Sequence, residues 1–305
     1  MAQAVRDLRR RIKAIRNTQQ ITRAMQMVAA AKLRKAQVRA VSARAYATRL
    51  EAMLHRLAQD GASVDHVLLK ARPVRRATLV VVTGDRGLAG SYNSNLIRQV
   101  EATAARLRSG PEPVEVRLVA VGRKGRDYFQ RRGWDVVREE VGVADDDLAG
   151  LARDLAVSFI DSFSREETDE VLVVYSRFVS PLQQKPTELR VLPIAEVVTA
   201  GKGEAEGRAP AGGVAPPLGY IYEPDARTVF GLLLPKFVTN EVYQCLLEGR
   251  ASEYAARMTA MKNATDNAEE LVGELTLEMH RARQTSITRE ITELVGGANA
   301  LKDRR

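Results

Sequence analysis

Three short stretches of this 305-residue chain combine residue types that could do chemistry. The first is Gly-Asp-Arg-Gly-Leu-Ala-Gly at 84–90, which follows a β-branched run and precedes a helical pattern. Glycine-rich turns at such a junction hold the phosphates of dinucleotides. This turn lacks both the GxGxxG spacing and the Lys-Ser/Thr pair of a P-loop, so no side chain is placed to hold phosphate or Mg²⁺. We therefore predict a structural turn whose glycines allow a helix to pack closely on the sheet, and no cofactor.

The other two stretches are also turns before helical patterns. Val-Gly-Arg-Lys-Gly at 121–125 places two cations side by side, and we interpret it as a solvated turn. Asp145, Asp146 and Asp147 resemble a crude cation site, but consecutive carboxylates point in different directions. Acidic residues before a helix more often cap its N-terminus. We predict that this acidic triplet caps the helix that follows it.

Histidine and cysteine add no catalytic or metal-binding pattern. His55, His66 and His280 lie far apart in the sequence and show no H-x-x-x-H spacing, so we predict no metal site. Cys245 is the single cysteine, which excludes a disulfide within the chain and favours a reducing compartment. No Ser/His/Asp or Cys/His arrangement is present, and we predict no catalytic residue.

Two long helical patterns at the ends of the chain frame these turns. Residues 3–57 contain no Gly or Pro and repeat apolar residues every three or four positions, which predicts one helix of roughly 80 Å. Pro235 suits a first helical turn, so the second helix is predicted at about 236–301. Helical patterns longer than about 25 residues indicate coiled coils, and we expect the two ends to pair. The apolar stripe of the second helix comprises Tyr254, Met258, Met261, Ala268, Leu271, Leu275, Met279, Ala282, Ile287, Ile291 and Leu294.

Small residues and methionines support this pairing. Residues 28–31 and Ala251, Ala255 and Ala256 would let two helices approach closely. The methionines at 25, 27, 258, 261 and 279 follow helical spacing, which is typical of a hydrophobic core.

Between the two helices, short β-branched runs alternate with helical stretches. Strands are predicted at 77–83, 114–121, 170–175 and 188–194, and helices at 93–108, 124–132 and 146–163. This alternation indicates a small α/β domain with a largely parallel sheet. The predicted domains are an N-terminal coiled-coil helix (1–58), a Rossmann-like α/β domain (59–198), a Gly/Pro-rich flexible linker (199–217), and a C-terminal part (218–305) with a last strand, a short helix and the long helix.

The net charge of +9 is concentrated at the N-terminus. The first fifty residues contain thirteen Lys or Arg and one acid, Asp7. Such a segment favours an acidic partner, either nucleic acid or an acidic protein surface. No run approaches the roughly 20 apolar residues that a membrane span requires.

Both helical ends carry motifs of a known family. Residues 11–36 read RIKAIRNTQQITRAMQMVAAAKLRKA, which resembles the N-terminal signature of F-type ATP synthase gamma subunits. Residues 256–268, ARMTAMKNATDNA, and 282–291, ARQTSITREI, resemble the C-terminal signature more closely still. The resemblance covers essentially the whole chain, including 84–88 and 222–225.

This resemblance implies a fold and an assembly. The fold class is α/β, with a long antiparallel coiled coil of the N- and C-terminal helices and a Rossmann-like α/β middle domain. In the family the coiled coil threads the α3β3 hexamer of alpha and beta subunits, while the middle domain sits with the epsilon subunit on the c-ring. The expected role is the central rotor shaft, a non-catalytic subunit of a proton-transporting two-sector ATPase that binds no nucleotide directly. The lone Cys245 favours a bacterial type, peripheral on the cytoplasmic face of the membrane and attached only through the Fo sector.

By the same resemblance, particular residues acquire roles. Met25, Arg283, Gln284, Thr288 and Glu290 fall where the shaft contacts the hexamer. Tyr222 lies in the region that meets epsilon and the c-ring. The basic N-terminal helix would face acidic loops of beta, which explains its charge without nucleic acid.

Two alternatives come from other classes of protein. A basic coiled-coil nucleic-acid-binding protein would show DNA affinity that falls steeply with salt. An enzyme that used the glycine turn would bind a dinucleotide. Neither is expected under the shaft interpretation.

Overall fold

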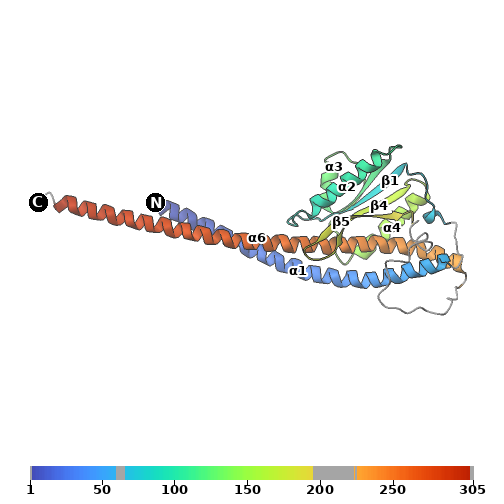
Figure 1. The fold of residues 1–305 in the computed structure, drawn as a ribbon, viewed down its shortest axis with the longest axis horizontal. Helices are drawn as coiled ribbons and strands as arrows, with labels where there is room; N and C mark the ends of the chain where they lie inside the picture. Colours follow the sequence, from blue (N-terminus) through green and yellow to red (C-terminus); the bar gives the residue numbers. More distant parts are fainter. Residues whose placement is uncertain (1, 60–65, 195–222, 224, 303–305) are drawn as a thin grey trace. The chain divides into compact units, whose positions relative to one another are not determined.

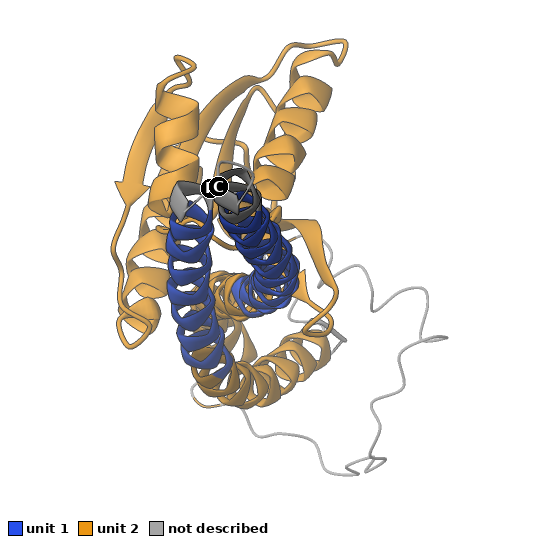
Figure 2. Cartoon of the chain, turned by 90° about the vertical axis from the view of Figure 1, so that its left-hand side faces the viewer, with its two compact units in different colours: residues 1–30, 257–305 blue, residues 31–256 orange. Residues whose placement is uncertain are grey.

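The computed structural model describes residues 2–59, 66–194, 223 and 225–302 (Figure 1). It contains two long helices, α1 (Ala2–Gln59) and α6 (Ala226–Lys302), and a five-stranded sheet between them in sequence. The predicted linker at 199–217 and Tyr222 lie outside the described residues, as does the first part of the segment that begins at 218. The chain divides into two compact units, residues 1–30 with 257–305 and residues 31–256, and both long helices contribute to each (Figure 2).

The sheet lies in the unit formed by residues 31–256. Its strand order is β3-β2-β1-β4-β5, with parallel pairing throughout except between β4 and β5. The strands are β1 (Arg76–Val82), β2 (Glu115–Val121), β3 (Val136–Glu140), β4 (Glu170–Phe178) and β5 (Gln184–Leu192). The predicted α/β class with a largely parallel sheet is confirmed.

Both edge strands differ from the prediction. β3 was not predicted, because it is short, mostly charged, and alternates between half-buried and exposed positions. β5 begins at Gln184, before the predicted start at 188. Its first half contains Lys185 and Pro186, residues that lower strand propensity but are tolerated at the edge of a sheet.

Helices cover both faces of this sheet. The helices between strands are α2 (Tyr92–Arg108), α3 (Arg123–Gln130) and α4 (Leu148–Ser164), and a 3₁₀ turn, η1 (Val67–Leu69), precedes β1. Successive residues of a strand point to opposite faces. Val80 and Val82 accordingly join a core with α4, α1 and α6, whereas Leu79 and Val81 join a second core with α2 and α3.

The long helices pack antiparallel within this unit. Lys32 of α1 lies 5.4 Å from the ring of Tyr254, and Arg44, further along α1, lies 3.3 Å from Glu248, earlier in α6. Towards its C-terminus α1 buries three leucines in the core that it shares with the first turns of α6. These are Leu50, Leu54 and Leu57.

In the other unit, formed by residues 1–30 and 257–305, the two helices run side by side (Figure 2). The buried hydroxyls of Thr22 and Thr265 are 2.8 Å apart and join the helices by a hydrogen bond. Ala29 is 2% exposed, as expected for a small residue at a close helix contact. The predicted coiled coil of the two ends is confirmed.

Helix α6 begins at Ala226, before the predicted start near residue 236. Asp225 caps it, because its carboxylate accepts hydrogen bonds from the backbone N–H and the hydroxyl of Thr228 at 2.9 and 2.7 Å. Pro235 is therefore inside the helix, not in its first turn, which costs about 3 kcal/mol. Burial of Phe230 and Leu234 in the core offsets that cost.

Candidate functional site

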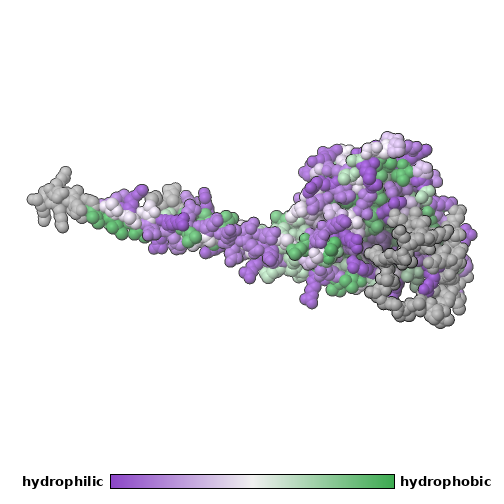
Figure 3. All heavy atoms as spheres, in the orientation of Figure 1, coloured by the Kyte–Doolittle hydropathy of each residue, from purple (hydrophilic) through white to green (hydrophobic). Residues whose placement is uncertain are grey.

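The C-terminal part of α6 exposes apolar side chains that the sequence predicted to be buried in the coiled coil. Ile287, Ile291 and Leu294 are 44%, 55% and 73% exposed, and Val295 is 54% exposed. Hydrophobic patches interrupt the hydrophilic surface near this end of α6 (Figure 3). The prediction that Ile287, Ile291 and Leu294 pack against the N-terminal helix is wrong, and Val295, outside the predicted stripe, adds to the exposed apolar surface.

The reason lies in the register of the two helices. Thr22 lies opposite Thr265, and both helices rise about 1.5 Å per residue, so Ala2 falls opposite about residue 285. Beyond that position the described part of α1 offers α6 no partner. Apolar residues that continue past the end of the pairing indicate a surface for another molecule.

Four of the predicted contact residues lie around the end of this pairing. Arg283, Gln284, Thr288 and Glu290 are all exposed. Gln284 and Thr288 are one helical turn apart, and the Thr288 hydroxyl donates to the Gln284 carbonyl at 3.0 Å. These two residues line a shallow groove of 720 Å³ with Arg281, Thr285, Arg289 and Thr292.

Arg283 and Glu290 lie on the neighbouring stripe of the helix. They are separated by two turns, with Ile287 between them. The Glu290 carboxylate accepts a hydrogen bond from the Ser286 hydroxyl at 3.2 Å. This second stripe thus combines predicted polar contacts with the exposed Ile287. Sequence periodicity alone could not distinguish such an exposed apolar residue from a core residue.

Met25 lies on the N-terminal part of α1. Its side chain is half-buried, whereas Met27 and Val28 are 62% and 57% exposed. Met27 was predicted to be a core residue and Val28 a helix-contact residue, and both predictions are wrong. They lie on the outer side of α1, away from the buried Thr22 and Ala29.

A side chain of α6 occupies the space beside the glycine turn at 84–90. A Cβ at Gly84 would lie 2.7 Å from the Glu253 carboxylate, so any larger residue would displace this side chain, which α6 packs against the turn. This confirms the prediction of a turn that permits close helix packing. The backbone N–H of Gly84 donates to Asn93 at 2.9 Å, which ties the turn to the start of α2.

The second glycine turn, at 121–125, is packed more than predicted. Arg123 and Lys124 are exposed, in agreement with a solvated turn, but Gly122 and Gly125 are not. Gly122 has φ +96°, and a Cβ there would lie 2.1 Å from the Thr83 carbonyl oxygen. Gly125 donates its N–H to the Thr83 hydroxyl at 2.9 Å, so both glycines hold the ends of β1 and β2 together.

The acidic triplet does not cap α4 with a side chain. Asp147 occupies the N-cap position, but its carboxylate makes no capping hydrogen bond. Asp145 and Asp146 instead bind side chains of the two long helices. The capping prediction is wrong because tertiary partners compete with the free N–H groups of the helix for these carboxylates.

Within the described residues, no group of three His, Cys, Asp or Glu side chains is arranged to hold a metal ion. Cys245 is fully buried on α6, and burial, reinforced by Glu241 and Glu248, raises the pKa of its thiol. His66 serves the 3₁₀ turn, since its Nδ1 accepts the N–H of Leu68 at 3.2 Å.

Among the helices that the structure describes, none combines the length and the apolar character that a membrane crossing requires.

The architecture defines the chain as a coiled-coil protein of two terminal helices with an inserted α/β domain. A family model described as ATP synthase matches residues 4–301. An ATP synthase gamma chain of Desulfitobacterium hafniense is 48% identical over 98% of this chain and 99% of the relative. One from Heliobacterium modesticaldum is 46% identical over 97% and 99%. This chain belongs to the ATP synthase gamma chain family, which confirms the resemblance of its helical motifs.

Solved structures agree. The central stalk and c-ring structure of the Tetrahymena thermophila mitochondrial ATP synthase contains a chain that is 26% identical, with a TM-score of 0.57 over 80% of this chain and 99% of that one. A chain of the Euglena gracilis mitochondrial ATP synthase rotor is 19% identical, with a TM-score of 0.61 over 94% of this chain and 100% of that one. The Euglena match concerns the fold alone.

Proposed function

We propose that this chain is the central rotor shaft of an F-type ATP synthase. It couples ion-driven rotation of the c-ring to ATP synthesis or hydrolysis in an α3β3 hexamer of alpha and beta subunits. The observation that carries the proposal is near-full-length similarity to gamma chains, at 48% identity. The exposed apolar and polar stripes of α6 past the end of its pairing with α1 give the chain a surface for that hexamer.

The shaft itself catalyses no reaction in this proposal. It is the non-catalytic subunit of a proton-transporting two-sector ATPase, and nucleotides bind to the hexamer. The chain lies on the cytoplasmic face of a bacterial membrane and is attached through the Fo sector. Tyr222 and its surroundings meet the epsilon subunit and the c-ring.

Rotation acts on the hexamer through differential contacts. A partner shifts a conformational equilibrium only by its unequal affinity for the two states, and a shift from 1:99 to 99:1 requires about 5.5 kcal/mol. One exposed ion pair contributes about 0–1 kcal/mol, so Arg283 alone is insufficient. The free energy for the shift therefore comes from many contacts together. These include the exposed apolar residues and Met25, Arg283, Gln284, Thr288 and Glu290.

The charge of α1 also fits this proposal. Seven Lys or Arg lie within residues 1–30, against the single acid Asp7. Further along α1, Lys35, Arg39 and Arg44 have partners in the chain's own Asp146 and Glu248. The charge left for an outside partner is thus concentrated near the N-terminus, beside the exposed end of α6. Acidic loops of beta fit it, and the comparisons give no support to the nucleic-acid alternative.

The proposal is tested by reconstitution. Membranes that hold Fo are combined with alpha, beta, delta and epsilon subunits, with or without this chain, and ATP-driven ion pumping is measured by quenching of a pH-sensitive dye. We expect pumping only when the chain is present. Pumping of equal rate without it would refute the shaft role, whatever the chain's effect on ATP hydrolysis.

A further inference from the structure

A loop of the α/β domain, residues 143–146, is held by α6 at two points one helical turn apart. We call it the acidic loop. The Tyr254 hydroxyl lies 2.7 and 2.8 Å from the two carboxylate oxygens of Asp145, and Arg250 Nε lies 3.7 Å from the same carboxylate. Arg250 also donates to the Val143 carbonyl at 2.8 Å. Both side chains of α6 thus bind the same short segment between β3 and α4.

The other long helix binds the same loop from α1. Arg39 donates to the Asp145 carbonyl at 2.6 Å and forms an ion pair with the Asp146 carboxylate. Lys35, one turn earlier, lies 3.6 Å from Asp146. The hydrogen bond from Arg39, together with the nearby charge of Lys35, lowers the pKa of Asp146. The Asp146 carboxylate therefore stays charged at neutral pH and can pair with both cations.

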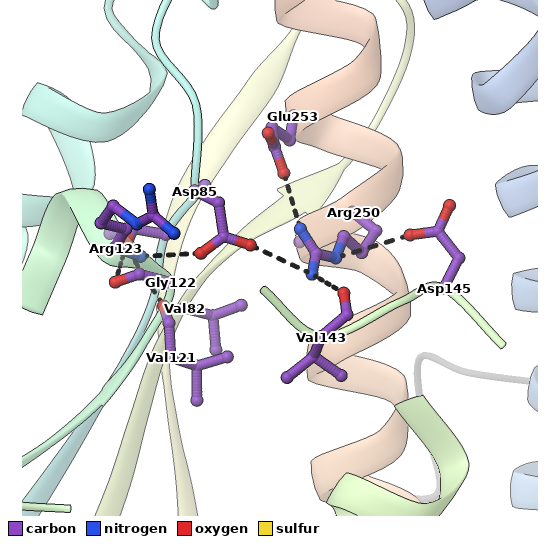
Figure 4. Close-up of polar contacts among 12 residues, drawn as sticks. Val82, Asp85, Val121, Gly122, Arg123, Val143, Asp145, Arg250 and Glu253 are labelled. Carbon is purple, nitrogen blue, oxygen red and sulfur yellow. Dashed lines mark hydrogen bonds and ion pairs between the residues drawn. The ribbon is translucent and has the colours of Figure 1, made fainter. Parts of the chain in front are cut away.

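Arg250 links the acidic loop to the glycine turn as well (Figure 4). Its guanidinium lies 4.0 Å from Asp85, which follows β1, and 3.2 Å from Glu253 on its own helix. The side chain of Arg250 is 13% exposed and that of Glu253 is 5% exposed. Burial would lower the pKa of Arg250, but Glu253, Asp145 and Asp85 outweigh it and raise that pKa.

Neighbouring contacts fix α6 against the sheet at the same level. The Ser252 hydroxyl, which is fully buried, donates to the Ser176 carbonyl of β4 at 2.8 Å. The Tyr92 hydroxyl of α2 donates to the Gly249 carbonyl at 3.0 Å. The helix is thus held from more than one side over little more than one turn.

We propose that the acidic loop and Arg250 form a torsional joint, in which positioning residues on both long helices lock the coiled coil to the α/β domain against rotation. The inference rests on the proposed shaft function and lies wholly within residues 31–256. The apolar core already joins both helices to the sheet, and the acidic loop adds directional polar contacts to that packing. Contacts from α1 and α6 to adjacent residues of one loop resist twisting of the pair, because any rotation moves the two helices in different directions relative to the loop.

Charged side chains suit such a joint better than apolar ones. Buried ion pairs contribute little net stability, since desolvation offsets their attraction, but their geometry is specific. An arginine presents a planar fork that holds several acceptors in fixed directions. Arg250 uses this property to hold two segments of the domain to one position on α6.

The test measures how well the shaft transmits rotation from the hexamer to the ion-pumping sector, separately from whether the complex assembles. The variants Arg250→Met and Arg39→Met are reconstituted singly and together into the complete ATP synthase, and the ratio of ATP-driven ion pumping to ATP hydrolysis is measured in the same vesicles. We expect hydrolysis to continue while the ratio falls about fivefold in the double variant, the scale of a modest coupling between sites. Arg126→Met is the matched control, because Arg126 pairs with Asp127 and Glu139 within the domain.

A charge exchange distinguishes positioning from general stability. Arg39→Asp is expected to lower the ratio, and the added change Asp146→Arg to restore most of it by re-forming the pair with reversed polarity. If Arg250→Met does not assemble, Asp146→Asn, which keeps the size of the side chain, is expected to lower the ratio in the same direction. A wild-type ratio in the double variant, or in Asp146→Asn, would overturn the joint. The shaft proposal would still stand, provided that wild-type chain restores pumping to membranes that lack it.

Discussion

At the scale of single residues, the glycine at the start of the β1–α2 turn has a specific steric reason. The Glu253 carboxylate occupies the space beside Gly84, and Arg250 holds that carboxylate in place. A dinucleotide fold would use such a turn for phosphate. Here the chain has placed its own carboxylate there, so the turn serves helix docking.

Substitution of Gly84 should therefore destabilise the fold, because Glu253 is held by Arg250 and would have to move. We expect Gly84→Ala to lower the free energy of unfolding by about 1–3 kcal/mol, as overpacking of a filled site does. Gly150→Ala is the matched control, because nothing lies within 4 Å of its Cβ position in α4. Alanine there should stabilise the helix by about 0.5–1 kcal/mol. Urea denaturation of the two variants measures both values, and equal stabilities would contradict the steric explanation.

The sequence predicted this turn but not its partner. A glycine-rich turn after a strand is a local pattern, and its spacing was enough to argue against a P-loop. Glu253 and Arg250 lie more than 150 residues away and follow ordinary helical spacing, so nothing local marks them. The same holds for Asp145 and Asp146, whose partners on two other helices were invisible to a capping argument.

At the scale of elements, α6 carries a half-buried glutamate, Glu241, where it lies in the domain. Burial and the nearby Glu51 and Glu248 raise the pKa of Glu241 from 4.5 to about 7. The folded chain then holds a proton that the unfolded chain releases between about pH 4.5 and 7. Stability conferred by the neutral form is present below this window and is lost as pH rises through it.

Glu241→Gln should remove this pH dependence. We expect the variant to be more stable than wild type by about 3 kcal/mol at most at pH 8, and the difference to shrink as the pH falls towards 4.5. Hydrogen exchange of α6 in the assembled complex at pH 6 and pH 8 is the measurement. The control is Glu269→Gln, an exposed position on the same helix. A pH-independent difference for Glu241→Gln would contradict the assigned cause.

The sequence predicted some helices and strands correctly and missed others. The two long helices follow from uninterrupted periodicity, and the buried parallel strands from β-branched runs, because both signals are local and repeated. β3 and the start of β5 were missed since edge strands carry charges and proline that core strands exclude. The start of α6 was missed because Pro235 looked like a beginning, although burial of Phe230 and Leu234 extends the helix past it.

At the scale of the whole molecule, the coupling between shaft rotation and the hexamer should depend on many contacts and not on one. The sum needed for a conformational switch of the hexamer, about 5.5 kcal/mol, exceeds what any single exposed side chain of α6 contributes. The predicted contacts of α6 lie close to its exposed apolar residues in one segment of the helix, and Met25 adds a contact from α1. Their effects should therefore accumulate.

We expect Arg283→Ala and Gln284→Ala each to lower ATP-driven pumping without preventing assembly. Adding Ile287→Ala and Leu294→Ala should lower it further, because under the proposed function these exposed side chains also contribute to binding of the hexamer. Pumping and subunit composition are measured on the same purified complexes. Loss of all pumping from Arg283→Ala alone, with the complex intact, would show that one contact dominates and would contradict the distributed coupling.

The burial of Cys245 has a practical consequence. The chain's single thiol is sealed inside the protein and strongly disfavours the reactive thiolate form, so maleimide dyes should leave the native chain unlabelled. A cysteine introduced at an exposed position of the α/β domain, such as Leu182, then becomes the unique attachment point of this subunit. A fluorophore or bead placed there would report the angular position of the shaft during turnover, without prior removal of a native cysteine.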